Sequence, residues 1–430
     1  MRVNFIYKQL HIIGGIIMSI DTLDELKHRK GIVKIRLTKK DGSPIKDTEV
    51  TVSQVKHKFL FGCGAFDSIP LANDELEEND KEKIEERFEK FFDVFNYATI
   101  PFYWGRFEPE KGKPDTKRLK KASEWLVSKG CLVKGHPLCW HTVTAPWLLD
   151  MSNEEILKAQ LNRINREVSD FKGLVDIWDV INEVVIMPIF DKYDNGITRI
   201  CKELGRIRLV KEVFNAAKQA NPEAILLIND FNTSISYEIL IEGCLEAGIP
   251  IDAIGIQSHM HQGYWGVEKT LEILERFSHF NIPLHFTENT LLSGHLMPPE
   301  IEDLNDYQIR DWPSTPDGEE RQAMEVIKHY KTLFSHPMVE SITWWNFCDE
   351  NAWLGAPAGL LRRDNSCKPS YYELKKLIKD EWWTHPTRLV TSNTGEFEFT
   401  GFLGEYELVI SDKRFYFTLD KNSTTIEITI

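Results

Sequence analysis

The sequence predicts a (β/α)8 barrel that carries a small β-sandwich built from both ends of the chain. Through the centre of the chain, apolar β-rich runs alternate with amphipathic helical runs, an order typical of parallel strands joined by helical crossovers. Near both ends, apolar and polar residues alternate in short runs, the pattern of half-buried strands. The length of 430 residues suits one large barrel with a smaller module.

Strand-like segments lie near both ends of the chain. Residues 31–55 contain the runs VKIRL and TEVTV on either side of DGSP, a turn signal. Residues 395–430 contain four or five more runs with glycine-centred turns; GEFEFTGF and GEYELVI resemble the second half of transthyretin-like sandwich domains, and 31–55 resembles the first half. Neither end has enough strands for a core of its own, so we expect the ends to form one sandwich. The alternative is two separate sets of strands lying on the barrel.

Eight strand-like segments are expected to form the barrel between these ends. They are residues 59–66, 95–103, 132–140, 175–182, 224–230, 252–259, 283–289 and 341–347. Amphipathic helical runs separate them and include residues 85–95, 206–220 and 269–277. The predicted domains are an N-terminal extension (1–28), the first part of the sandwich (29–56), the barrel (57–385) and the second part of the sandwich (386–430).

Composition narrows the class of partners. Apolar residues make up 42% of the chain and charged residues 27%, a balance typical of globular proteins. The formal net charge is −14, which disfavours nucleic acid and anionic membranes as partners. We therefore expect neither a nucleic acid nor a membrane as a partner.

The cysteines and the first residues bear on location. Seven cysteines occur at wide spacings without a CxxC pair, which favours reduced thiols in a cytoplasmic protein over disulfides or a zinc site. In the first twenty residues, Arg2 and Lys8 precede an apolar run that imitates a signal peptide, but no small-residue cleavage site follows. We interpret this segment as an extension, with translation starting at Met1 or Met18. A signal sequence or anchor, and hence secretion, is the alternative.

Two glutamates follow apolar, β-rich runs. Glu183 lies in WDVINEVV (178–185) and Glu288 in LHFTENT (284–290). Cleavage of a glycosidic bond needs two carboxyl groups, one to protonate the leaving oxygen and one to attack or to activate water. Because the carboxyl ends of parallel barrel strands converge on one site, these glutamates are a candidate catalytic pair. The alternative for each is a solvated charge or a salt-bridge partner.

Six motifs occur in order along the predicted barrel. They are GHPLCWH (135–141), WDVINE (178–183), INDFN (228–232), GIQSHM (255–260), HFTE (285–288) and a run from ITWWNF (342–347) to KPSYYEL (368–374). With these motifs the chain resembles glycoside hydrolase family 10, the family best known for xylanases, from about Phe59 to Leu374. Each motif alone is weak, but all six in register with the expected strands are specific.

The resemblance implies a role for each catalytic candidate. Glu183 would be the general acid/base and Glu288 the nucleophile of a retaining mechanism, with their carboxyl groups about 5–5.5 Å apart. Burial and the Glu288 charge would raise the pKa of Glu183. Asn182 would hydrogen-bond the 2-hydroxyl of the sugar, an interaction that strengthens in the transition state.

The resemblance also implies a set of substrate-binding residues. The subsite next to the scissile bond would be lined by His136, Trp140, Gln257 and His259, with Trp345 and Trp353 as aromatic walls and roof. His259 would contact the nucleophile, and an ordinary buried histidine is the alternative. Core packing is the alternative for the last two tryptophans. His141 is interpreted as architectural.

The chain departs from the family pattern at two places. Xylanases of this family commonly carry Glu-Asn-x-x-Lys where this chain has TIPFYWG (99–105), so that Thr99, Ile100 and Tyr103 replace polar groups that hold the next sugar. A site that loses such groups loses discrimination, and plain xylan becomes a doubtful substrate.

The second departure follows the nucleophile. Thr290 stands where the family commonly has an aspartate that partners the histidine, so the pair of His259 and Glu288 must be tuned differently.

These observations predict a retaining β-glycoside hydrolase that needs no metal or organic cofactor and acts on a β-linked oligo- or polysaccharide. The alternatives are a hydrolase or transglycosylase of small β-glycosides, and a non-catalytic carbohydrate-binding barrel. An insertion at 292–318 follows the nucleophile strand, where loops shape the rim of a barrel site. It either closes one end of a cleft or is a solvated loop.

Overall fold

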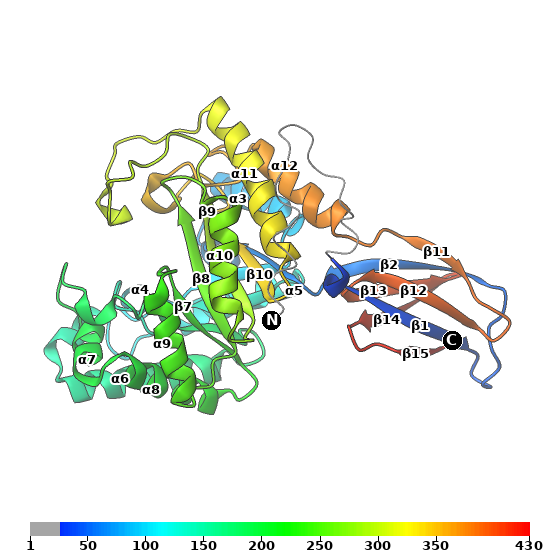
Figure 1. Ribbon diagram of the computed structural model, residues 1–430, viewed down its shortest axis with the longest axis horizontal. Coiled ribbons are helices and arrows are strands. Elements are labelled where there is room, and N and C mark those ends of the chain that lie inside the picture. Colours follow the sequence, from blue (N-terminus) through cyan, green and yellow to red (C-terminus); the bar gives the residue numbers. More distant parts are fainter. Residues whose placement is uncertain (1–25) are drawn as a thin grey trace, which may run out of the picture.

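The computed structural model describes residues 26–430. The interpretation of the first twenty residues as an extension or a signal sequence lies outside the described residues. Within 26–430, the chain forms a barrel and a separate two-sheet module, which stand side by side in Figure 1.

Eight parallel strands close into a barrel at the centre of the chain. They are β3 (Leu60–Gly64), β4 (Tyr97–Pro101), β5 (Leu132–His136), β6 (Ile177–Asn182), β7 (Ile225–Asp230), β8 (Ala253–Met260), β9 (Leu284–Leu291) and β10 (Val339–Trp344). Each strand pairs with the next, and β10 closes the ring against β3. The predicted (β/α)8 barrel is confirmed, and each expected strand contains the observed one or lies within three residues of it at either end.

Helices surround the barrel and connect its strands. They are α2 (Ser68–Ala72), α3 (Glu78–Phe92), α4 (Trp104–Phe107), α5 (Thr116–Ser128), α6 (Asn153–Asp170), α7 (Gly196–Leu204), α8 (Arg206–Ala220), α9 (Ile235–Glu246), α10 (Gly266–Ser278), α11 (Pro316–Ser335) and α12 (Pro369–Lys376). Short turns of helix are η1 (Lys27–Arg29), η2 (Pro146–Asp150), η3 (Met187–Ile189), η4 (Leu304–Asp306), η5 (Trp353–Gly355) and η6 (Leu377–Glu381). Of residues 26–430, no helix has the length and apolar character needed to cross a membrane.

Strand alternation divides the barrel core into two layers. Inside the barrel, Tyr97, Ile177, Leu227 and Ala253 form a small apolar cluster. The alternate residues of the same strands, such as Ile100 of β4, pack outward in the large cluster between strands and helices. Because successive side chains of a strand point to opposite faces, the strand sequence decides which residues reach the inside of the barrel.

The second module is a sandwich to which both chain ends contribute. One sheet has the order β12 (Glu396–Phe402), β1 (Lys30–Thr38), β15 (Thr425–Thr429), and the other has β11 (Thr387–Val390), β2 (Glu49–His57), β13 (Gly404–Ile410), β14 (Lys413–Leu419). Strands β1 and β2 of the first segment each lie between strands of the second, as the interleaved blue and orange-red arrows in Figure 1 show. Apolar residues of both sheets share one core. The pairing of the two ends in one sandwich is confirmed.

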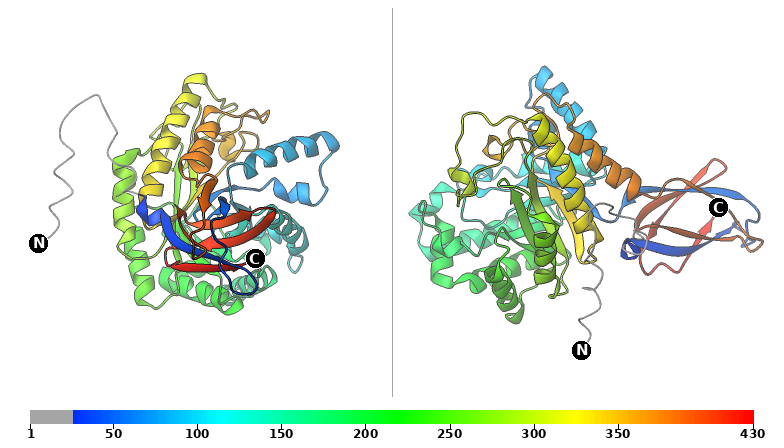
Figure 2. Two further views of the ribbon diagram at one scale, coloured as in Figure 1. Left: turned by 90° about the vertical axis from the view of Figure 1, so that its right-hand side faces the viewer. Right: turned by 45° about the horizontal axis from the view of Figure 1, so that its top comes forward.

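The sandwich is attached to the end of the barrel where the strands begin. Arg29 donates hydrogen bonds to the backbone oxygens of Phe334 (2.9 Å) and His336 (2.7 Å), just before β10. Its guanidinium also lies 4.7 Å from the ring centre of Phe59, just before β3. Trp382 stacks on Phe334 with 4.1 Å between ring centres. The right view in Figure 2 shows the sandwich on one side of the barrel, and in the left view it lies in front of the barrel. It therefore lies away from the carboxyl ends of the strands.

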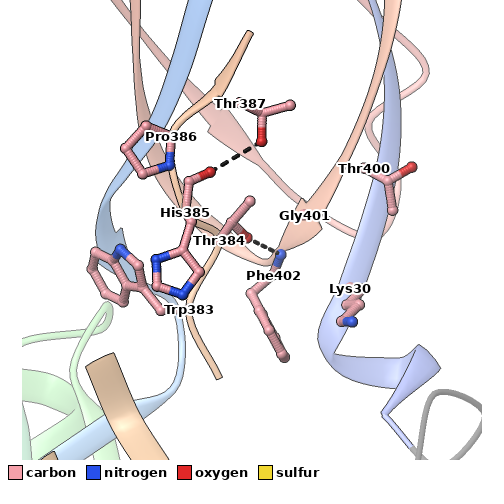
Figure 3. A pocket seen from close by; sticks show the side chains of 9 residues that line it. All are labelled: Lys30, Trp383, Thr384, His385, Pro386, Thr387, Thr400, Gly401 and Phe402. Atoms are coloured by element: carbon pink, nitrogen blue, oxygen red, sulfur yellow. Dashed lines mark hydrogen bonds between the residues drawn. The ribbon is translucent and has the colours of Figure 1, made fainter. Parts of the chain in front are cut away.

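A hollow of about 260 Å³ lies at this junction and is drawn in Figure 3. The hydroxyl of Thr384 accepts a hydrogen bond from the Phe402 N–H at 2.8 Å, and Thr387 donates to the His385 carbonyl at 3.0 Å. The first bond holds the segment that leads from the barrel into β11 against β12, and the second lies within that segment. The hollow belongs to the connection between the two modules.

Candidate active site

Glu183 follows β6 in a left-handed backbone conformation with φ of 56°. Such a conformation is uncommon for a residue with a side chain and persists where the surroundings enforce it. Here the Glu183 N–H donates to the Asn229 carbonyl at 2.8 Å, and Arg206 donates to the carbonyls of Val184 and Val185. These bonds fix the sharp turn by which the Glu183 side chain leaves the strand.

Three side chains donate hydrogen bonds to the Glu183 carboxyl group. The indole Nε1–H of Trp140 donates to Oε2 at 2.8 Å. The side-chain amides of Asn182 and Gln257 lie 3.2 and 3.3 Å from Oε1. The carboxyl group of Glu183 is therefore oriented by residues from the ends of three strands, β5, β6 and β8.

Glu288 lies within β9 and is only 4% exposed. Its Oε1 accepts from the Asn229 amide at 2.9 Å, and its Oε2 lies 3.0 Å from His259 Nε2. The same Asn229 amide nitrogen lies 2.8 Å from Asn182 Oδ1, and the Thr287 hydroxyl donates to Asn229 Oδ1 at 2.6 Å. Asn229 thus links the carboxyl group of Glu288 to the residue beside Glu183.

The two carboxyl groups have opposite pKa shifts. Burial raises the pKa of Glu183 to about 8, the Trp140 hydrogen bond opposes the rise, and the charges of Asp230 and Glu288 add to it. Burial also acts to raise the pKa of Glu288, but the His136 charge and the His259 hydrogen bond outweigh it, so that this pKa is lowered. At neutral pH one group is protonated and the other ionised, as acid and nucleophile require.

His259 stands between Glu288 and Thr290. Its Nε2 lies 3.0 Å from Glu288 Oε2 and its Nδ1 lies 3.0 Å from the Thr290 hydroxyl. An ionised carboxylate only accepts, so Nε2–H donates to Glu288. A threonine hydroxyl is able to donate to Nδ1, which an aspartate cannot do, so Thr290 is compatible with a neutral imidazole. This position is the second departure that the sequence revealed.

A second buried charge pair lies beneath His136. Asp179 Oδ2 is 2.7 Å from both Lys134 Nζ and His136 Nδ1. Against the effect of burial, the Lys134 charge and the His136 hydrogen bond lower the pKa of Asp179. Because the ionised Asp179 accepts from Nδ1–H, the His136 ring is fixed with Nε2 directed toward Glu288, 3.9 Å from its Oε1.

Aromatic rings enclose the two glutamates. Trp345 meets His136 edge-on with 5.2 Å between ring centres and lies 5.9 Å from His259. Trp353 lies 4.7 Å from His259. Tyr103, which follows β4, lies 5.8 Å from His136 and 5.5 Å from Trp140. The structure therefore brings all nine predicted site residues into one constellation at the carboxyl ends of the strands.

Ile100, which was named from the sequence, does not border this constellation. Ile100 is fully buried in the core between the barrel and its helices, so the expectation that it contacts a second sugar is wrong. The reason is the alternation of β4, which directs Tyr97 inward and Ile100 outward. Thr99 is fully buried on the same face of β4 as Tyr97, and Tyr103 is the residue of the three whose ring contacts His136 and Trp140. His141 is buried against Phe190, with 4.5 Å between ring centres, and it lies 3.9 Å from Glu183 Oε2.

Sequence reasoning missed Asn229, Asp230 and Asp179. Asn229 joins the two glutamates, Asp230 accepts from the Val185 N–H at 3.0 Å, and Asp179 orients His136. All three are buried polar residues in strands that are mostly apolar and buried. Buried polar groups need partners, so this contrast was the available signal. Across the described chain, 26–430, no three His, Cys, Asp or Glu side chains gather as a metal site would require.

Comparisons with known proteins place this site in context. The profile described as "Glycosyl hydrolase family 10" matches residues 64–377. The endo-1,4-beta-xylanase B of Thermotoga neapolitana is 27% identical over 317 residues, which covers 68% of this chain and 84% of that protein. The anti-sigma-I factor RsgI6 of Acetivibrio thermocellus is 25% identical over 408 residues, which covers 92% of this chain but 47% of that protein.

One solved structure illustrates the likeness of the fold. The crystal structure of xylanase 10B from Thermotoga petrophila in complex with xylobiose aligns with a TM-score of 0.61 and 24% identity, over 75% of this chain and 95% of that one. About a quarter of this chain is not matched by that structure, and the sandwich is large enough to account for most of this difference.

Proposed function

Because this chain belongs to glycosyl hydrolase family 10 and is a glycoside hydrolase that resembles endo-xylanases, we propose that it hydrolyses β-linked glycosides with retention of configuration. Glu183 is the general acid/base and Glu288 the nucleophile of this proposal. One observation carries it: the partly buried carboxyl group of Glu183 and the buried one of Glu288 share a hydrogen-bonded network, yet the pKa is raised to about 8 in Glu183 and lowered in Glu288. Such a split is what a double displacement needs.

In the first step, the Glu288 carboxylate attacks the anomeric carbon and the bond to the leaving oxygen breaks. Glu183 gives its proton to that oxygen, and the glycosyl group stays on Glu288 as an ester. In the second step, Glu183, now ionised, removes a proton from water, which attacks the same carbon and releases Glu288. Proton transfer by a positioned side chain contributes about 10²–10⁴-fold to the rate.

The remaining site residues position the sugar in this mechanism. The side-chain amide of Asn182 hydrogen-bonds the 2-hydroxyl, and Gln257 holds Asn182 Oδ1 at 3.0 Å. His136 and Trp345 bound the sugar on the side of β5 and β10. Trp140 links the acid/base to these sugar-contacting residues through its hydrogen bond to Glu183.

The substrate class follows from the relatives and from Tyr103. Relatives named endo-1,4-beta-xylanase support a β-1,4-linked glycan as substrate. Tyr103 stands at the site with a phenol where the family resemblance expects a lysine, so we propose a specificity other than that for plain xylan. Small β-glycosides, hydrolysed or used in transglycosylation, are included in this proposal.

The experiment that tests the mechanism uses 4-nitrophenyl β-xylobioside and 4-nitrophenyl β-cellobioside. The wild type is expected to release nitrophenol from at least one of them, and proton NMR should detect the β-anomer first. Glu288→Ala should lower kcat by about 10⁴-fold or more, and Glu183→Ala by about 10²–10⁴-fold on a substrate with a poor leaving group. Azide should restore turnover with an α-glycosyl azide for Glu288→Ala and a β-glycosyl azide for Glu183→Ala.

Glu325→Ala serves as the matched control. Glu325 is partly buried on α11, away from the site, and burial raises its pKa as well. This variant should keep the wild-type rate. First formation of the α-anomer would refute the retaining mechanism, and no turnover of any β-glycoside would refute the proposed function.

A further inference from the structure

The insertion after β9 is a folded wall at the rim of the site. Residues Leu292, Met297 and Trp312 pack with Ala356 and Ala358 in a small core of their own. The Trp312 indole donates to the His295 carbonyl at 2.8 Å. This connection between β9 and α11 arches out beyond the strand ends in Figure 1. Of the two alternatives for this insertion, the structure therefore shows a folded element at the rim and not a solvated loop.

The wall rests on the loop that follows β8. The Met297 N–H donates to the His261 carbonyl at 2.9 Å. The Gln262 amide donates to the carbonyls of Pro298 (3.0 Å) and Ile301 (2.8 Å). These bonds direct the insertion from β9 across the end of β8.

The far end of the wall reaches the loop that carries the acid/base. Lys192, in the connection between η3 and α7, lies 2.6 Å from Asp303 Oδ2 and 2.8 Å from Asp306 Oδ1. Because β6, β7, β8 and β9 are neighbours in this order, a contact between the loops after β6 and β9 spans the ends of β7 and β8. We call Lys192, Asp303 and Asp306 the clasp.

The clasp lies on the leaving-group half of the site. His136, Tyr103 and Trp345 bound the sugar on the side of β4, β5 and β10. Glu183 stands at the end of β6 and protonates the leaving oxygen in the proposed mechanism, so the leaving group extends from Glu183 toward the ends of β7 and β8. That is the half that the clasp spans.

We propose that the clasp closes the leaving-group half of the cleft and limits the leaving group to a single sugar or a small aglycone. The inference rests on the proposed function and adds the class of substrate: glycosides with a short reducing-end portion. The ion pairs are solvent-exposed, with side chains 41%, 35% and 65% accessible, so they are weak individually and screened by salt. The clasp is therefore weak enough to open and acts as a graded filter.

The experiment compares two substrates in each variant. One is 4-nitrophenyl β-xylobioside, with a small leaving group, and the other is xylopentaose labelled at its reducing end. The cellobioside and cellopentaose form the second arm. In the wild type, the labelled product should be the single reducing-end sugar, and kcat/KM should be far higher for the aryl glycoside. Lys192→Glu should raise the ratio of pentaose to aryl kcat/KM by about threefold to tenfold and release longer labelled products.

The charge-reversed triple variant K192E/D303K/D306K should restore the wild-type ratio and products. Lys58→Glu is the matched control, because Lys58 forms an equally short exposed ion pair with Asp420 at 2.6 Å in the sandwich. Hydrogen–deuterium exchange of residues 297–312 provides a second readout and should accelerate in Lys192→Glu alone.

The outcomes separate the two proposals. Aryl hydrolysis with an unchanged ratio and unchanged products in Lys192→Glu would overturn the clasp and leave the proposed function intact. A wild type that cleaves xylopentaose or cellopentaose in the middle as readily as the aryl glycoside would overturn it as well. If no β-glycoside is turned over, the proposed function fails and the clasp inference with it.

Discussion

The indole Nε1–H of Trp140 donates a 2.8 Å hydrogen bond to Oε2 of Glu183. This bond favours the ionised carboxylate, whereas burial favours the protonated acid and raises the pKa of Glu183 to about 8. Two opposing effects therefore set the pKa of Glu183, and a single substitution removes one of them.

Trp140→Phe should raise the pKa of Glu183, because the substitution removes the donor that stabilises the charged form. The general acid must be protonated, so activity falls as pH rises through this pKa. The basic limb of kcat/KM should move to higher pH by about one to two units, since one unit corresponds to about 1.4 kcal/mol and a hydrogen bond to a charged group contributes about 1.5–3 kcal/mol.

The limb position is read from pH–rate profiles with an aryl β-glycoside, since Trp140 also borders the sugar and its loss changes the absolute rate. Trp147→Phe is the control, because its indole donates to the backbone carbonyl of Glu108 at 3.0 Å. An unmoved or acid-shifted basic limb in Trp140→Phe would contradict the argument.

Asp230→Asn should move the same limb in the opposite direction. The Asp230 charge raises the pKa of Glu183, so neutralising it should lower that pKa and shift the basic limb to lower pH, by about half a unit to one unit. Asp230 itself is buried, and its pKa is raised to about 7. Its charge is therefore present mainly above pH 7, so its effect on the pKa of Glu183 should be seen in that part of the profile.

Asp252→Asn is the matched control for this prediction. Asp252 also accepts a backbone N–H, from Leu226 at 3.0 Å, but its side chain is at the start of β8 rather than at the site. A shift of the limb of equal size in this control would show that the effect of Asp230 is not electrostatic.

Glu183→Gln should make the protein more stable at alkaline pH. The folded-state pKa of Glu183 is about 8 against 4.5 for the ordinary group, so the folded protein binds the extra proton between these values. Stability from this group is complete below pH 4.5 and is lost as pH rises through 8. The variant lacks this loss and should gain about 1–3 kcal/mol in free energy of unfolding at pH 8.

The matching substitution Glu288→Gln should have the opposite sign. The pKa of Glu288 is lowered, so this group contributes stability above its ordinary pKa, and the contribution is lost as pH falls. Chemical denaturation from pH 3 to 9 measures both variants, because the Glu288 contribution is lost only below its ordinary pKa of 4.5. Parallel stability curves for wild type and Glu183→Gln would contradict the burial argument.

Tyr103 should restrict the use of plain xylan. Its ring lies against His136 and Trp140 where the family resemblance expects an ammonium group. We expect the wild type to be weak on unsubstituted xylan compared with another β-glycoside. Tyr103→Lys should raise kcat/KM for xylotetraose by about threefold to tenfold, because each recovered hydrogen bond contributes about 0.5–1.5 kcal/mol.

Tyr372→Lys is the control for that substitution, since Tyr372 is 61% exposed on α12. The measurement is product release from xylotetraose and from unsubstituted xylan. Wild-type turnover of xylohexaose near the ~10⁸ M⁻¹s⁻¹ upper range of enzymes would show that Tyr103 does not exclude plain xylan.

Much of the fold was readable because its causes are local. The amphipathic run at 206–220 coincides with α8, since a periodicity of 3.6 residues directly records which face of a helix is buried. The runs at 224–230 and 252–259 match β7 and β8 for the corresponding reason. Glu183 and Glu288 were accessible to the same reasoning, because strand ends in a parallel barrel converge wherever their sequence positions lie.

Only the tertiary structure decided the properties that depend on many distant groups. The split of pKa values between Glu183 and Glu288 arises from burial and from the charges of Asp230 and His136, which no spacing in the sequence reveals. The outward direction of Ile100 and the contact of Lys192 with Asp303 are likewise settled by register and loop path. Local patterns determine which elements form, whereas dielectric surroundings and the meeting of loops are properties of the assembled barrel.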